Sequence, residues 1–265
     1  MPTETRTKIT VPKLLARKAS GEKITMLTAY DFPTAQLVDE AGIDIVFVGD
    51  SLGREELGYE DTIEVTMDDM LHHCRAAHRG TKSALLLVDM PFLSYQINAD
   101  DAVRNAGRML QEGHANAVKL EGGTSIAPTI RRIVDAGIPV MGHVGFQPQS
   151  VNITGIAKQG KDEESAARVL EDALAVEEAG AFAVVLELVP FDLAARITQA
   201  LKIPTIGIAA GPQCDGQVLV ITDLIGLRPH ARVLKHVKQY AHVGADIERA
   251  LRAFKDDVVA GRYPE

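Results

Sequence analysis

Four acidic side chains follow apolar runs in this sequence, each at the point where a buried strand would end. Asp50 closes one such run, and Asp89, Glu121 and Glu187 close three others. An unpaired charge in an apolar interior costs many kcal/mol, so these carboxylates need a partner. A single one could be a turn former or a helix cap. Four at corresponding positions indicate a common site.

The chemistry of such a site depends on how its negative charge is balanced. Two like charges about 5 Å apart repel by roughly 3 kcal/mol at an effective dielectric of 20, so a cation must neutralise the group or some members must stay protonated. The ligand atoms are oxygens, which favours Mg²⁺ or Mn²⁺ completed by water and substrate. The histidines around Cys74 lie in a helical pattern and are interpreted as surface or helix-end residues.

A lysine and a serine accompany the carboxylates. Lys119 precedes Glu121 by two residues, so both side chains leave a strand on the same face. If that face is an interior, Lys119 is either an ion-pair partner or an anion site for a substrate carboxylate beside the metal. Ser51, next to Asp50, could donate a hydrogen bond to the same anion.

These residue types would support removal of a proton next to a carbonyl group. A metal chelated by a 2-oxo acid stabilises the enolate and lowers the barrier to loss of the C3 proton. The candidate base is Glu187, which apolar Leu186 and Leu188 flank. A helix-capping or ion-pair role is the alternative for this residue.

The elements that would position these residues recur along the chain. Apolar runs, several of which follow a helical stretch that ends at glycine, are centred near Met26, Phe47, Leu86, Val118, Met141, Val184, Ile206 and Leu219. Helical periodicity separates most of them, clearly over 66–78, 100–112, 125–136 and 163–179. Thr66 with Asp69 predicts a capping box, and Asp192 is a candidate N-cap for the helix that runs toward Leu201.

Eight strand-like runs alternating with helices predict a single (β/α)₈ TIM barrel over residues 1–265. In such a barrel the C-terminal strand ends form the mouth that holds the site. A doubly wound open sheet is the alternative. It is disfavoured because the first strand is followed by TAYDFPTA and not by a glycine-rich fingerprint. The weakest unit is the last, where a short connection separates Ile206 from Leu219.

Composition limits the partners and the compartment. A net charge of −8 disfavours nucleic acid and anionic membranes, although not a small anionic substrate. Cys74 and Cys214 cannot build a disulfide framework, and the polar start of the chain lacks an apolar signal region, so we expect a cytoplasmic protein. No apolar run approaches the roughly 18 residues of a membrane helix.

Several motifs, in order along nearly the whole chain, resemble ketopantoate hydroxymethyltransferases, which are also called 3-methyl-2-oxobutanoate hydroxymethyltransferases. They are TAYD (28–31), VGDSLG (48–53), LLLVDMPF (85–92), VKLEGG (118–123), GHVGFQPQSVN (142–152), LELVP (186–190) and IPTIGIAAGPQCDGQVLV (203–220). The resemblance implies a barrel of the phosphoenolpyruvate/pyruvate superfamily. It implies transfer of a hydroxymethyl group from 5,10-methylenetetrahydrofolate to 3-methyl-2-oxobutanoate, giving 2-dehydropantoate in pantothenate biosynthesis, by a cytoplasmic homodecamer.

The resemblance also implies roles for the residues at the strand ends. The metal site for Mg²⁺ would consist of Asp50, Asp89 and Glu121. The substrate would be bound at the same place by Ser51, Lys119 and His143, together with Asp50 and Asp89. Glu187 would accept the proton.

Departures from the family pattern fall near the expected mouth. Arg54, Glu55 and Glu56 stand where apolar or small residues are usual, Lys161 replaces an arginine, and Ala209 replaces a glycine. They leave open a related transferase that uses another 2-oxo acid. The polar segment 155–164, GIAKQGKDEE, is predicted to be mobile and to close over the mouth.

Two other functions remain open. A lyase or mutase of the same superfamily would place a reactive cysteine in a loop after a strand, a setting that neither Cys74 nor Cys214 has. A ligand-binding barrel without turnover could use the glycine-rich loop GIAAGPQCDG for phosphate, although that loop is also explained as a tight connection.

Overall fold

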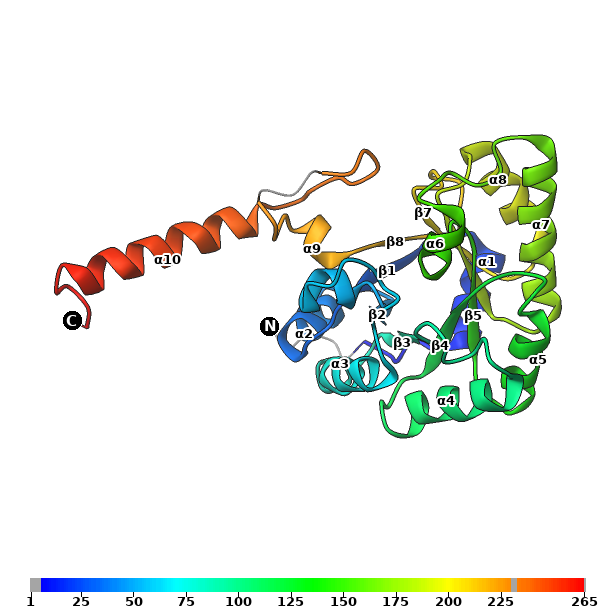
Figure 1. Ribbon diagram of the computed structural model, residues 1–265, viewed down its shortest axis with the longest axis horizontal. Coiled ribbons are helices and arrows are strands. Elements are labelled where there is room, and N and C mark those ends of the chain that lie inside the picture. Colours follow the sequence, from blue (N-terminus) through cyan, green and yellow to red (C-terminus); the bar gives the residue numbers. More distant parts are fainter. Residues whose placement is uncertain (1–5, 230–232, 265) are drawn as a thin grey trace. The chain divides into compact units, whose positions relative to one another are not determined.

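The computed structural model describes residues 6–229 and 233–264 and contains a closed barrel of eight parallel strands (Figure 1). The predicted (β/α)₈ barrel is confirmed, including its short last unit. The strands are β1 (Ile24–Thr28), β2 (Ile45–Val48), β3 (Leu85–Asp89), β4 (Ala117–Glu121), β5 (Val140–Gly145), β6 (Ala183–Glu187), β7 (Thr205–Ile208) and β8 (Gly216–Leu219). Each strand pairs with its sequence neighbour, so the carboxyl ends of all strands meet at one rim.

Helices alternate with the strands and lie around them (Figure 1). The longer ones in the barrel are α1 (Val11–Ser20), α2 (Phe32–Glu40), α3 (Met67–Gly80), α4 (Ala99–Gln111), α5 (Ala127–Asp135), α7 (Glu163–Glu178) and α8 (Phe191–Ala200). Short turns between strands and helices are the π-helix η1 (Gly53–Leu57), the 3₁₀ turn η2 (Pro148–Ser150) and α6 (Val151–Thr154). The four segments with clear helical periodicity are thus confirmed as α3, α4, α5 and α7.

The helix starts follow their capping chemistry, with one exception to our prediction. Thr66 and Asp69 form the expected capping box, in which each side chain accepts the other's backbone N–H. Asp192 does not cap α8, because it lies inside the helix, which begins at Phe191 with Pro190 at the N-cap position. Asp192 lies in the first turn instead, where its negative charge interacts favourably with the positive end of the helix dipole.

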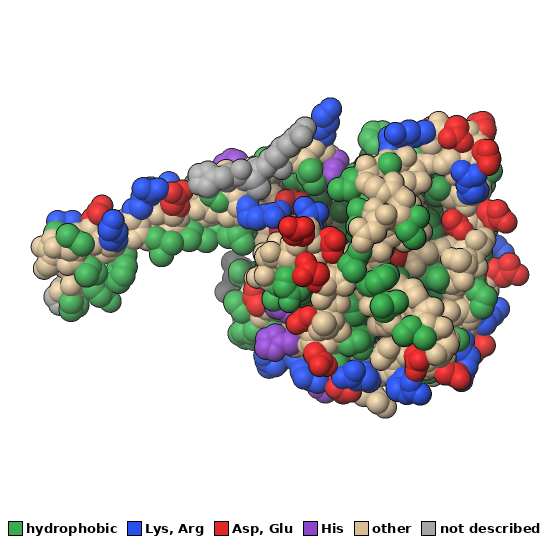
Figure 2. Space-filling model, in the orientation of Figure 1, with side chains coloured by type: hydrophobic (Ala, Val, Ile, Leu, Met, Phe, Trp, Pro, Cys, Tyr) green, Lys and Arg blue, Asp and Glu red, His purple; other side chains and the backbone are tan. Residues whose placement is uncertain are grey.

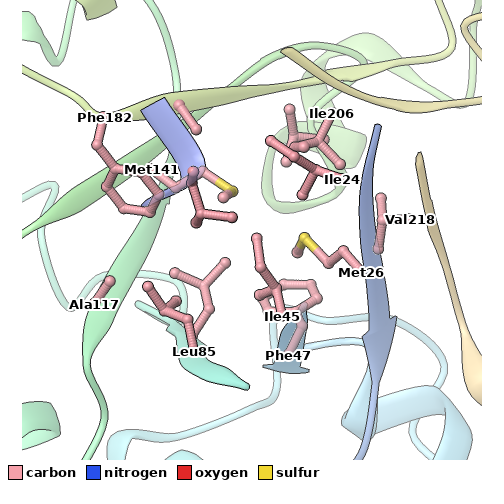
Figure 3. Close-up of a cluster of buried hydrophobic side chains, with 14 of the residues drawn as sticks. Ile24, Met26, Ile45, Phe47, Leu85, Ala117, Met141, Phe182, Ile206 and Val218 are labelled. Carbon is pink, nitrogen blue, oxygen red and sulfur yellow. The ribbon is translucent and has the colours of Figure 1, made fainter. Parts of the chain in front are cut away.

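Alternate strand residues fill the barrel interior with apolar side chains (Figure 3). Successive side chains of a strand point to opposite faces, so every second residue points inward. The inward set includes Ile24, Met26, Ile45, Phe47, Leu85, Leu87, Ala117, Met141, Ala183, Val185, Ile206 and Val218. Continuing this alternation toward the carboxyl ends of the strands leads directly to the polar residues of the candidate site.

The contacts divide the chain into two compact units, Met1–Val218 and Leu219–Glu265. The first contains the barrel. The second contains α9 (Ile221–Leu224) and α10 (Val243–Val259), and backbone hydrogen bonds such as that from Val243 N to Ile225 O join the residues that follow α9 to the start of α10. That residues 1–265 act as one domain stays a prediction. Across the described residues, none of the helices has the length and apolar character needed to span a membrane.

Candidate active site

The candidate site is a polar layer above the apolar interior, formed at the carboxyl ends of adjacent strands. Asp89 on β3 is in register with Lys119 on β4, and Glu121 on β4 is in register with His143 on β5. Glu187 is the last residue of β6. Each continues the inward alternation of its strand, for example Leu85, Leu87 and Asp89. The structure therefore brings the predicted residues of β3 to β6 together, as the spacing of Lys119 and Glu121 predicted.

The residues just after β2 complete this layer. Asp50 is buried, and its backbone N–H donates to Asp89 Oδ2 at 3.0 Å. Burial raises the pKa of Asp50 well above its usual range, and the nearby charges of Asp89 and Glu121 raise it further. Burial also raises the pKa of Asp89, although Lys119 opposes this. The protein alone therefore does not fully balance the negative charge that these two acids would carry when ionised.

Lys119 is the cation that the protein itself provides. Its Nζ lies 2.8 Å from Asp89 Oδ1 and 5.5 Å from the centroid of the Phe47 ring in the apolar layer below. Burial acts to lower the pKa of Lys119, but Asp89, Glu121 and Asp50 outweigh it and raise the pKa above its ordinary value. Lys119 is therefore charged at neutral pH and offsets one of the three carboxylates around it.

His143 connects the acidic layer to Glu187. Its Nδ1 lies 3.1 Å from Lys119 Nζ and 3.5 Å from Glu121 Oε1, while its Nε2 lies 3.2 Å from Glu187 Oε2. Burial and the Lys119 charge act to lower the pKa of His143, but the nearby carboxylates of Glu121 and Glu187 raise it to about 9. For Glu121, burial acts to raise the pKa, but His143, Lys119 and the backbone N–H of Gln149 together lower it below its ordinary value.

Ser51 has a partner that the sequence did not reveal. Its Oγ lies 2.8 Å from the hydroxyl of Tyr30, which belongs to the TAYD motif after β1. Burial raises the pKa of Tyr30 above its usual value, so the phenol stays protonated. Tyr30 can therefore fix the direction of the Ser51 hydroxyl, next to Asp50.

Gln149, in η2, is a site residue that the sequence analysis missed. Its side-chain Nε2 donates to Asp50 Oδ2 at 2.9 Å, and its backbone N–H donates to Glu121 Oε2 at 2.9 Å. Gln149 lies inside the motif GHVGFQPQSVN, which was the only available signal. Residue type and spacing could not identify it, because a glutamine in a loop is normally exposed.

The oxygen atoms of Asp50 and Asp89 suit a hard divalent cation. No group of three or more His, Cys, Asp or Glu side chains within residues 6–229 and 233–264 has an arrangement that could hold a metal ion. Mg²⁺, however, is usually bound through one or two carboxylates and completed by water and substrate oxygens. Burial and the neighbouring carboxylates disfavour the charged form of Asp50 and so raise its pKa, and a bound cation would offset this. The residues present therefore fit such an ion, with Glu121 nearby.

A cavity of about 380 Å³ adjoins this layer. Glu121 and Gln149 contribute to its wall, together with apolar Phe92 and Ile126 and the exposed side chain of Ile153. Another cavity, of about 420 Å³, is lined by residues that precede β1, such as Arg6 and Arg17, and by none of the acidic layer. Of these two cavities, the first can therefore bring a ligand to the candidate site.

Fold and site together define an α/β-barrel enzyme with acid, lysine and histidine side chains at the C-terminal ends of its strands. The family model described as ketopantoate hydroxymethyltransferase matches residues 8–265, so the chain belongs to the ketopantoate hydroxymethyltransferase family. It is 54% identical over 261 residues to the 3-methyl-2-oxobutanoate hydroxymethyltransferase of Moorella thermoacetica. The alignment covers 98% of this chain and 97% of the relative. The enzyme of the same name from Acetivibrio thermocellus is also 54% identical, in an alignment that covers 97% of this chain and 91% of the relative.

Solved structures support the fold. A phosphonopyruvate hydrolase in complex with oxalate and Mg²⁺ matches with a TM-score of 0.64 at 17% identity, covering 95% of this chain and 87% of the other. A 2,3-dimethylmalate lyase of the PEP mutase/isocitrate lyase superfamily matches with a TM-score of 0.59 at 16% identity, covering 95% and 88%. The family match and the curated relatives confirm the resemblance to the family and the prediction of a transferase enzyme. The role of each site residue stays a prediction.

Proposed function

We propose that this chain transfers a hydroxymethyl group from 5,10-methylenetetrahydrofolate to 3-methyl-2-oxobutanoate, giving 2-dehydropantoate in pantothenate biosynthesis. The observation that carries the proposal is the joint layer of Asp50, Asp89, Lys119 and Glu121 with His143 and Glu187, in a chain of this family. A 2-oxo acid needs a cationic group for its carboxylate and a base near C3. This layer offers both within one mouth.

The carboxylate of the substrate would be bound by Lys119 and Ser51. Lys119 is charged and buried, and its charge would become available to the substrate carboxylate once a divalent cation offsets Asp50 and Asp89, while Tyr30 directs the Ser51 hydroxyl. Asp50 and Asp89 would hold Mg²⁺ or Mn²⁺, with Glu121 nearby. When bound, the cation would supply positive charge that stabilises negative charge developing on the ketone oxygen.

Glu187 would accept the C3 proton. Its carboxylate lies on the rim and remains partly open to solvent, and His143 Nε2 at 3.2 Å can hold one oxygen while the other takes the proton. C3 then forms a bond to the methylene carbon of the folate as one C–N bond breaks, and the hydroxyl of a water molecule replaces the second C–N bond. The two folate nitrogens take up the C3 proton and one proton of that water. Overall the reaction consumes one water and releases tetrahydrofolate, and the cavity beside Glu121 and Gln149 has room to bring the donor near.

The experiment is product identification. The purified protein is incubated with Mg²⁺, methylenetetrahydrofolate and 3-methyl-2-oxobutanoate, with other 2-oxo acids in parallel, and the products are identified by mass spectrometry. We expect 2-dehydropantoate as the main product. Absence of product, together with no deuterium exchange at C3, would reject the proposal. A preferred product from another 2-oxo acid would instead identify a related transferase.

The buried cysteines favour this function over a cysteine-dependent lyase or mutase. Cys74 lies inside α3, and burial raises the pKa of its thiol to about 12. Burial also raises the pKa of Cys214. A raised pKa keeps both thiols protonated, which disfavours the reactive thiolate at neutral pH. Full activity of a Cys74→Ser/Cys214→Ser double variant is the expected result.

A further inference from the structure

The side chain of Gln149 is at the centre of a buried hydrogen-bond network next to the acidic layer. Only 5% of the residue is exposed. Its Nε2 donates to Asp50 Oδ2 and to Met90 O, both at 2.9 Å. Its Oε1 lies 2.7 Å from the Tyr95 hydroxyl and 3.1 Å from Gln96 Nε2. An amide side chain has two donor hydrogens and two acceptor lone pairs, so the hydrogen-bonding capacity of Gln149 is fully used.

These contacts fix the direction of the amide. Nε2 faces Asp50 Oδ2 and Met90 O, which only accept, so a 180° turn of the amide would replace these two hydrogen bonds by two repulsive oxygen–oxygen contacts. Tyr95 adds a further link, because its hydroxyl oxygen also accepts from the backbone N–H of Glu121 at 3.1 Å and lies 3.1 Å from Glu121 O. Burial makes any broken member of this network costly.

One residue thereby reaches two carboxylates from different strand ends. The Gln149 side chain holds Asp50, which follows β2, and its backbone N–H holds Glu121, which ends β4. A carboxylate with one oxygen held by an amide presents its other oxygen in a defined direction. Partners of this kind orient metal-binding and substrate-binding groups, and their loss typically costs 10–100-fold in affinity or activity.

We propose that Gln149 is a positioning residue, which orients Asp50 and Glu121 for the divalent cation and the 2-oxo acid, and that Tyr95 orients its amide. This inference rests on the proposed function, because it concerns the same site. A merely structural role for Gln149 would lower stability without changing the affinity of the folded protein for a cation. Cation affinity therefore separates the two roles.

The test measures Mn²⁺ binding to the full chain by isothermal titration calorimetry, with thermal unfolding in parallel. We expect Gln149→Leu, which keeps the volume and removes the amide, to bind Mn²⁺ about 10–100-fold more weakly than the wild type. The matched control is Asn116→Ala. Asn116 Oδ1 accepts from Leu86 N at 3.0 Å near the start of β3, so its loss should lower the melting temperature and leave the Mn²⁺ affinity unchanged.

Tyr95→Phe keeps the buried ring and tests the same contact without truncating Gln149. We expect weaker Mn²⁺ binding here too, and a double variant whose loss is smaller than the product of the single losses, because both changes act on one amide. Wild-type affinity in Tyr95→Phe and in Gln149→Leu would overturn the inference while the proposed function stands. Failure of the wild type to bind Mn²⁺, with or without 3-methyl-2-oxobutanoate, would overturn both.

Discussion

At the residue scale, the site combines side chains whose electrostatic needs are met only by one another. Lys119 is surrounded by Asp50, Asp89 and Glu121, and the pKa of Asp50 is raised even so. Replacing one partner leaves an uncompensated buried charge, which costs more than the pair contributes. Individual substitutions in this layer should therefore affect ligand binding and folding together, and Glu187, at the partly exposed rim, is the exception.

Glu187→Gln separates proton transfer from binding. The amide keeps the size of the side chain and its distance to His143 Nε2, 3.2 Å in the wild type, but it cannot accept the C3 proton. We expect deuterium exchange at C3 of 3-methyl-2-oxobutanoate to fall by about 10²–10⁴-fold, with Mn²⁺ affinity retained. The control Glu178→Gln, on the exposed end of α7, should behave as the wild type. Unchanged exchange in Glu187→Gln would show that another group is the base.

Ala209 offers a stability prediction from backbone geometry. Its φ of 53° lies in the left-handed region, which costs an L-residue roughly 1–2 kcal/mol, and it stands where the family pattern has glycine. Ala209→Gly removes this strain but adds unfolded-state entropy, so we expect the free energy of unfolding to rise by about 0.5–1 kcal/mol. Chemical denaturation measures it. Ala167→Gly, at an exposed position of α7, should lower it by about 1 kcal/mol.

The residues that could be predicted from sequence are those that strand alternation places. Lys119 and Glu121 share a face because a strand has a period of two, and Asp89 and Glu187 close strands whose apolar residues were evident. Gln149 and Tyr30 could not be found this way. They reach the site from loops, and their partners are distant in sequence, so no local pattern records the contact.

At the element scale, the strands were predictable and the connections at the mouth were not. All eight predicted strand centres fall within observed strands, because buried parallel strands require apolar runs. The π-helix η1, by contrast, depends on contacts made only in the folded chain. A Cβ on its first residue, Gly53, would lie 2.6 Å from Val65 Cγ2, so the close packing of two loops decides the turn. Arg54, Glu55 and Glu56 lie in this turn.

The segment that follows η2 should close on ligand binding. Ile153 is 90% exposed and Ile156 is 75% exposed, which is unfavourable for side chains beside an apolar cavity wall. We expect peptides that cover residues 151–164 to exchange amide hydrogen about tenfold more slowly when Mg²⁺ and 3-methyl-2-oxobutanoate are present. Hydrogen–deuterium exchange mass spectrometry measures this, with α5 as the internal control. Equal exchange with and without ligands would contradict closure.

At the scale of the whole molecule, the candidate site lies entirely within one of the two compact units. All residues with a proposed role, from Tyr30 to Glu187, belong to Met1–Val218. The unit Leu219–Glu265 supplies none of them, and its longest element, α10, has Gly244 as its only buried residue among those described. An exposed helix of 17 residues gains little stability from its own sequence. Association with another protein surface would stabilise it.

The apolar side chains of α10 lie along one side of the helix (Figure 2). Ile247, Leu251, Phe254 and Val258 recur at spacings of four, three and four and are 44–64% exposed. That spacing produces a continuous stripe, which in water favours burial against another protein surface. The family resemblance implies a homo-oligomer, so we propose a second copy of this chain as the partner of the stripe.

Charges placed in this stripe should dissociate the oligomer. We expect the wild type to have a molar mass several times 28.6 kDa in size-exclusion chromatography with light scattering, and Leu251→Glu/Phe254→Glu to shift it to a smaller species. A carboxylate buried at a symmetric interface would have no cationic partner. The cost of burying two of them should exceed the free energy that burial of the apolar stripe contributes to association. Lys255→Ala, on the same helix but outside the stripe, should leave the mass unchanged. A wild type of 28.6 kDa, or an undisturbed mass in the double variant, would exclude α10 as the interface.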